Sequence, residues 1–320
     1  MNEDPPSMLL SRVAESAYWA GRYLERAEGT ARLVKTHADL IVDLPRQASV
    51  GWQPLLAVLG MDEAGEPEAA PTVEDGVVRL LVADLSNPSS VRACIAAAHQ
   101  NLRVTRAVMP IEAGEVLTDL HHQAEETSDE ATDRRTRSAW LTSVIRHCQT
   151  LSAILRETMS HDDAYYFFTI GRQLERADLT TRVLDSQRQI LTRSVRGPLE
   201  PYVDLCWHAA LRSVSALQPF RRSGLPTSPE ATVSFLLRNV KCPRSVEHCM
   251  VEAARAMLEV SHHEHAMSAC AAVQQLLSDA DIAALCAGEL HDYVDALQVA
   301  INDVHVHMAQ SWFAPQPIIA

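Results

Sequence analysis

The stretch GRYLERAEGTARLV at residues 21–34 returns in the same chain as GRQLERADLTTRVL at residues 171–184. The two stretches share, in the same order and without a gap, Gly, Arg, Leu, Glu, Arg, Ala, an acidic residue, Thr, Arg and an aliphatic residue. Around both, apolar residues recur at intervals of three and four positions, which is the spacing of a helix face. We therefore expect a fold organised around two related, highly charged helices.

Two shorter matches extend the repeat. WQPLL at residues 52–56 parallels WHAAL at residues 207–211, and PSSVRACIAAA at residues 88–98 parallels PRSVEHCMVEA at residues 243–253. The offset is 150 residues for the charged stretches and 155 for the other two pairs. Three matches in one order predict a tandem duplication of a helical unit of about 150 residues. We assign the two units to residues 8–155 and 156–313 and expect them to pack as one body.

The composition favours helices throughout. The 320 residues include only 11 glycines and 5% aromatic residues, whereas strands and their turns draw on aromatic, β-branched and glycine residues. Helix-forming Ala, Leu, Glu, Arg and Gln are plentiful. The sequence therefore predicts an all-α helical bundle.

Charge and cysteine content narrow the class of protein. The net charge of -13 argues against nucleic acid or an anionic membrane surface as a partner. No apolar run is long enough to cross a membrane, and the acidic N-terminus lacks the regions of a signal peptide. The seven cysteines contain no C-x-x-C pair and fit reduced thiols. We expect a cytoplasmic protein.

Helix boundaries follow from local signals. Residues 8–43 read as one long helix with Ser11 as its cap, ending before Pro45, because proline disfavours helix at the preceding residue. Residues 73–84 are predicted to be helical. Another long helix is predicted to open at Asn87-Pro88, because proline suits a first helical turn.

The charged residues of the two repeated stretches are the candidate site. They are Arg22, Glu25, Arg26, Glu28, Arg32, Arg172, Glu175, Arg176, Asp178 and Arg182. On a solvated helix face such residues would form pairs worth about 0.2–0.5 kcal/mol each. Yet these positions persist between the halves, whereas apolar positions diverge, as at Ala31 and Thr181. We therefore predict partly buried ion pairs at the contact between the halves. There Glu25 would meet Arg172 and Arg176, and Glu175 would meet Arg22 and Arg26.

The stretch LLSRVAESAYWAGRYLERAEGTARLV at residues 9–34 resembles the opening of the bacterial alpha-E domain proteins. That family has a recurring Glu-Arg motif, which maps to Glu25-Arg26 and Glu175-Arg176, and the resemblance spans essentially the whole chain. It implies a tandem helical protein without an established reaction. The gene neighbourhoods of the family imply a peptide synthesis or modification system with ATP-grasp ligases, transglutaminase-like proteins and an NTN-hydrolase-type peptidase. We accordingly expect an accessory or scaffold protein with an ATP-grasp ligase and a transglutaminase-like protein as partners.

A second hypothesis is an enzyme or a protein that binds an anionic ligand. The motif carboxylates would then act as acid and base, and the arginines would clamp a peptide, carboxylate or phosphate. Motif side chains that line an open cleft would favour this hypothesis, and side chains sealed between helices would favour the scaffold.

Other chemistry has little support in the sequence. Arginines within a turn of each acidic pair oppose a metal ion, and the histidines of SHHEHAMSAC at residues 261–270 do not change this, so we predict no metal and no cofactor. The chain has neither a Gly-x-Ser-x-Gly elbow nor a glycine-rich phosphate loop. Cys94 and Cys249 are predicted to be small buried apolar groups, and Trp52 and Trp207 core anchors.

Overall fold

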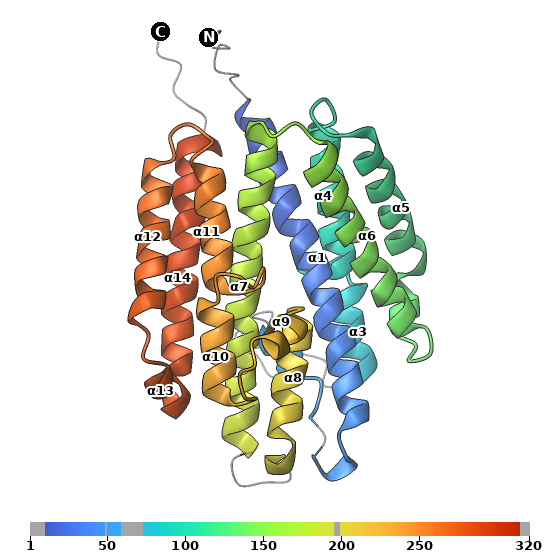
Figure 1. Cartoon of the computed structure of the whole chain (residues 1–320). Coiled ribbons are helices and arrows are strands. Elements are labelled where there is room, and N and C mark those ends of the chain that lie inside the picture. Colours follow the sequence, from blue (N-terminus) through green and yellow to red (C-terminus); the bar gives the residue numbers. More distant parts are fainter. Residues whose placement is uncertain (1–9, 49, 59–72, 195–198, 314–320) are drawn as a thin grey trace.

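The computed structural model describes residues 10–48, 50–58, 73–194 and 199–313, and within these ranges it contains helices and no β-strand (Figure 1). The predicted all-α class is therefore confirmed. The α-helices are α1 (Ser11–Asp43), α2 (Pro54–Val58), α3 (Glu74–Val82), α4 (Val91–Val104), α5 (Ile111–Thr127), α6 (Arg137–Thr158), α7 (Asp163–Ser194), α8 (Val203–Ser213), α9 (Leu217–Arg222), α10 (Pro229–Arg238), α11 (Val246–Met257), α12 (Glu264–Asp279), α13 (Ile282–Ala284) and α14 (Leu290–Met308). Short 3-10 turns occur at Arg46–Ala48, Ser128–Ala131 and Glu200–Tyr202, and π-helical turns at Leu285–Glu289 and Ala309–Phe313.

Two long helices, α1 and α7, form the centre of the bundle (Figure 1). Helices α4, α5 and α6 lie on the side of α1, and helices α11, α12 and α14 lie on the side of α7. Most buried apolar residues from both halves of the described chain belong to one continuous core, and Leu40, Leu44, Val50, Cys206 and Ala209 form a second, smaller cluster. The predicted division between residues 155 and 156 falls in the last turn of α6. The duplication itself stays a prediction from the sequence.

Helix α1 has nearly the predicted extent, but its N-cap residue differs from the predicted one. Its N-cap is Leu10 in an extended conformation, and Ser11 is already the first helical residue, so the predicted cap is wrong. The helix ends before Pro45, as predicted. It packs against α4, α6, α7 and α8, and it is therefore buried on almost every side. Its charged motif residues consequently lie in the interior.

Helix α4 begins three residues later than the proline signal indicates. Ser90 is its N-cap, with its hydroxyl oxygen accepting a 3.1 Å hydrogen bond from the Ala93 N–H. Asn87 instead closes the preceding turn, donating to the Leu80 carbonyl at 2.8 Å and accepting from the Ser89 N–H at 2.9 Å. The side-chain bonds of Asn87 hold the chain out of a helix until Ser90, which is why the predicted start was wrong.

Candidate functional site

Helices α1 and α7 touch through two glycines, one from each helix. A Cβ atom added to Gly21 would overlap the Phe168 carbonyl oxygen, and one added to Gly171 would overlap the Tyr18 carbonyl oxygen. Further along, Gly29 faces Leu179, so the two helices run in the same direction. Only glycine permits so close a backbone approach. This contact places the charged residues that follow each glycine between the helices.

On one side of the contact, Glu175 is held by two arginines of α1. Arg22 Nε lies 2.6 Å from Oε2 of Glu175, and Arg26 Nε lies 2.5 Å from Oε1. Arg26 Nη2 adds a third bond to Oε2 at 3.0 Å. Arg22 also donates to the Tyr18 hydroxyl at 3.1 Å, and that hydroxyl lies 2.8 Å from Nδ1 of His305. Arg22, Arg26 and Glu175 are therefore all paired.

On the other side, Glu25 is held by Arg176 of α7 and by Arg244, which lies just before α11. Arg176 Nε and Nη2 reach Oε1 and Oε2 of Glu25 at 3.1 and 2.7 Å, and Arg244 Nη1 pairs with Oε1. Arg244 also bridges to Glu28 through Nη2, at 3.0 Å. Glu28 has a further ion pair with Arg32.

The remaining acidic member of the set makes only a local contact. Asp178 accepts a 2.8 Å hydrogen bond from Arg182, one turn further along α7. The structure thus brings nine of the ten candidate residues into ion pairs, six of them with a partner from another helix or segment. The tenth, Arg172, has no ion pair among the described residues, and its buried Nε has no hydrogen-bond partner there. The predicted pairing of Glu25 with Arg172 is not observed.

The pKa values follow from this pairing. Burial alone would raise the pKa of Glu25, but Arg176 and Arg244 outweigh it and lower the pKa to about 2. Burial likewise opposes ionisation of Glu175, and Arg22 and Arg26 outweigh it and lower its pKa. With a pKa of about 2, the Glu25 carboxylate carries no proton at neutral pH and is a weak base. The arrangement suits electrostatic attachment of two helices better than proton transfer.

The two motif carboxylates are buried. The side chains of Glu25 and Glu175 are 1% and 4% exposed. Motif side chains line none of the cavities found in the described ranges at α1/α7/α8, at Trp52, between α12 and α14, or between α4 and α5. The largest of these, a groove of about 770 Å³, lies between α4 and α5. Because the carboxylates are buried between helices and line none of these cavities, the geometry favours a structural role for the motif.

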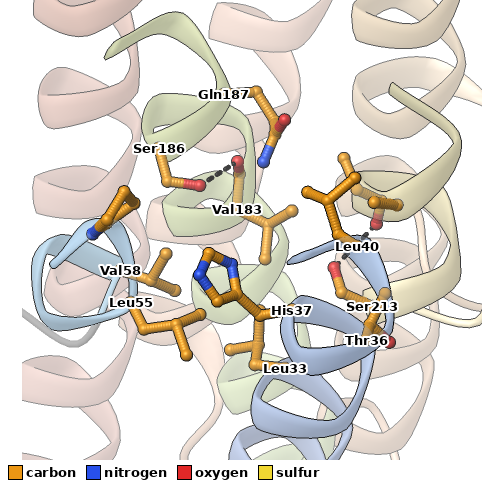
Figure 2. Close-up of a pocket in the computed structure, with 13 residues that line it drawn as sticks. Leu33, Thr36, His37, Leu40, Leu55, Val58, Val183, Ser186, Gln187 and Ser213 are labelled. Carbon is orange, nitrogen blue, oxygen red and sulfur yellow. Dashed lines mark hydrogen bonds between the residues drawn. The ribbon is translucent and has the colours of Figure 1, made fainter. Parts of the chain in front are cut away.

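A small cavity of about 30 Å³ lies further along the same helix pair (Figure 2). His37 of α1 and Gln187 of α7, which are 150 residues apart, both line it. His37 Nε2 lies 2.9 Å from the Gly51 carbonyl oxygen, and burial lowers the pKa of His37 to about 4. Oε1 of Gln187 is buried without a hydrogen-bond partner among the described residues. The volume suffices for one water molecule and for no larger ligand.

The other chemically interesting residues have structural positions. Cys94 and Cys249 are fully buried, each with Sγ toward the proline carbonyl six residues earlier, and burial raises both pKa values to about 12. Trp52 and Trp207 are buried in the core, as predicted. In the described part of the chain, no three His, Cys, Asp or Glu side chains are grouped so that they could hold a metal ion.

The sequence prediction missed Arg244, Tyr18 and Gln149, whose Nε2 lies 3.4 Å from Oε1 of Glu28. Arg244 could have been found from the sequence. It stands in the matched stretch at residues 243–253, where the first half has Ser89. Tyr18 likewise corresponds to Phe168 in the second half. Gln149 lies on α6, outside every matched stretch, and nothing in the sequence pointed to it.

Comparison with known proteins identifies a family that has a Glu-Arg motif. A family model described as Alpha-E, a predicted alpha-helical domain with a conserved ER motif, matches residues 9–313. Glu-Arg occurs in the chain at residues 25–26 and 175–176, at the two buried carboxylates. No curated protein and no solved structure matches the chain. None of the described helices combines the length and apolar character that a membrane span requires. Because the match covers nearly the whole chain, the protein belongs to the Alpha-E family.

Proposed function

We propose that this protein is an accessory or scaffold component of a cytoplasmic peptide synthesis or modification system, with an ATP-grasp ligase and a transglutaminase-like protein as its partners. In this proposal the Glu-Arg motif performs no chemistry. It fixes the register of α1 and α7, so that the two halves present one rigid surface to those partners.

The observation that carries the structural part of the proposal is the saturation of the two motif carboxylates. Both oxygens of Glu175 accept from Arg22 and Arg26, and both oxygens of Glu25 accept from Arg176, with Arg244 added. A substrate that approached either carboxylate would have to displace a buried, charge-assisted hydrogen bond. The system and its partners come from the family resemblance and remain part of the proposal.

Reconstitution tests the function directly. The full chain is combined with the ATP-grasp ligase and the transglutaminase-like protein encoded by neighbouring genes, together with ATP and candidate amino acids. Mass spectrometry then follows the product in reactions with and without the chain. We expect a complex by gel filtration and a product that forms faster, or only, when the chain is present. Unchanged product formation without the chain, together with no detectable complex, would refute the scaffold.

The second hypothesis, an enzyme or a binder of anionic ligands, is tested in the same reaction with Glu25→Gln. Loss of product with unchanged thermal stability would assign chemistry to Glu25. We expect the opposite pattern, a large loss of stability, because the substitution leaves Arg176 and Arg244 facing a neutral side chain.

A further inference from the structure

Arg172 is the unpaired member of an otherwise paired set. Its counterpart 150 residues earlier, Arg22, has Glu175 and the Tyr18 hydroxyl as partners. Two differences between the halves accompany the missing partners of Arg172. Phe168, at the position of Tyr18, has no hydroxyl, and Arg244 rather than Arg172 is the second arginine of Glu25. The Nε of Arg172 is consequently buried without a hydrogen bond among the described residues.

The network as a whole also carries excess positive charge. Its arginines are Arg22, Arg26, Arg32, Arg172, Arg176, Arg182 and Arg244, and its carboxylates are Glu25, Glu28, Glu175 and Asp178. Three more cations than anions therefore lie between or beside buried helices of a chain whose net charge is -13. Among these arginines only Arg172 lacks an ion pair with a described residue, and a buried charge without a partner is costly, so the excess favours a negatively charged partner near Arg172.

We propose that Arg172, beside Arg176 and Arg244, binds an oxyanion, either a phosphate group or a carboxylate. The guanidinium fork matches both groups through parallel N–H donors. Arg172 is partly exposed and the Arg244 side chain is 13% exposed, so part of each of these two side chains is in contact with solvent. This site is separate from the proposed scaffold function, and either can fail without the other.

The electrostatics around Arg172 agree with this assignment. Burial and then the repulsion of Arg176 and Arg244 lower the pKa of Arg172 to about 10, and Glu25 offsets only part of that effect. The paired arginines behave in the opposite way, because carboxylates raise the pKa of Arg22 and Arg176. A bound oxyanion would give Arg172 the stabilisation that its counterpart already has.

Thermal unfolding of the full chain tests the site, with chloride, phosphate and acetate salts compared at equal ionic strength so that screening is constant. We expect phosphate or acetate to raise the melting temperature saturably, by about 3 °C or more. Arg172→Gln should abolish that rise. Arg182→Gln is the matched control, because Arg182 lies on the same helix and already has Asp178 as its partner; this variant should keep the rise.

The salt comparison identifies the class of anion and tests the role of Arg172. A rise with phosphate alone identifies phosphate as the ligand class, and a rise with acetate extends it to carboxylates. An equal rise in Arg172→Gln, or no saturable rise with either anion, overturns the proposal. If Arg172→Gln fails to fold, Arg172→Lys keeps the charge but removes the fork, and the apparent affinity for the anion should fall at least several-fold; an unchanged affinity would again overturn the site.

Discussion

Glu175 and Glu25 lie 150 residues apart at matching positions, yet the structure surrounds them differently. Glu175 has two arginines, both from α1, and all three of these groups are paired. Glu25 has one arginine from α7 and one from the segment before α11, while Arg172 is left over. Arg244 stands where the matching stretch of the first half has Ser89, so one residue outside the helix pair gives Glu25 a partner that has no counterpart beside Glu175.

The glycine contacts, in contrast, are alike on the two sides. Gly21 lies against the Phe168 backbone and Gly171 against the Tyr18 backbone, at corresponding positions of the two helices. Backbone contact tolerates no added atom, whereas a long arginine can reach a carboxylate from several directions. The packing of α1 on α7 is therefore nearly symmetric and the charge network is not.

Replacing each motif carboxylate should have the largest effect. We expect Glu25→Gln and Glu175→Gln each to lower the free energy of unfolding by about 3–5 kcal/mol, because buried arginines lose their partners. Glu25→Gln should cost more, since its side already carries the unpaired Arg172. Urea denaturation measures both values. Equal losses of unfolding free energy in the two variants would show that the unpaired Arg172 does not affect stability. Losses near zero would contradict burial of the ion pairs.

Substituting alanine at the two contact glycines should lower the stability of the protein by equal amounts. Gly21→Ala and Gly171→Ala each place a methyl group on a carbonyl oxygen of the facing helix, so we expect each to destabilise the protein by about 3 kcal/mol. Gly114→Ala on α5 is the control, because its Cβ would meet nothing within 4 Å and alanine favours helix. Chemical denaturation of the three variants measures this. A tolerated alanine at either contact would show that the helices are not held at that distance.

His37 and Gln187 occupy matching positions and line the same cavity, but only His37 can take up a proton in the acidic to neutral pH range. His37 is neutral when folded, with a pKa of about 4, whereas the unfolded chain takes up a proton near its ordinary pKa of 6.5. Its contribution is therefore complete above pH 6.5 and is lost as the pH falls toward 4. Between pH 6.5 and 4.5 we expect His37→Gln to lose about 2 kcal/mol less stability than the wild type. Identical pH profiles would show that His37 is accessible to protons in the folded state.

The two matching arginines should give the smallest effect and the sharpest contrast. Arg22→Gln removes partners from Glu175 and Tyr18, and we expect a loss of about 1–2 kcal/mol because Arg26 still holds Glu175. Arg172→Gln, measured in chloride alone, should be neutral or stabilising, since it removes an unpaired charge. Guanidinium chloride would screen these charges, so urea is the suitable denaturant. If Arg172→Gln lowered the free energy of unfolding as much as Arg22→Gln does, Arg172 would have a stabilising partner and the two arginines would be equivalent.

Much of the fold could be predicted because it depends on local chemistry. Helix α1 extends over Ser11–Asp43 where periodicity and Pro45 indicated a helix and its end, and α3 follows the prediction within two residues. The start of α4 could not be predicted from proline alone, because the bonds of Asn87 to Leu80 and Ser89 delay the helix. That delay depends on side-chain geometry that a proline preference does not contain.

The sequence by itself determined the all-α class, the two charged helices and the recurrence of glycine, glutamate and arginine at one spacing. These are properties of periodicity and composition, which act along the chain. Only the tertiary structure decided that α1 is buried on almost every side, that Arg244 joins Glu25 and Glu28, and that Arg172 has no partner among the described residues. The physical reason is that ion pairing in an interior depends on which groups meet across helices, and residues distant in sequence compete there for the same carboxylate oxygens.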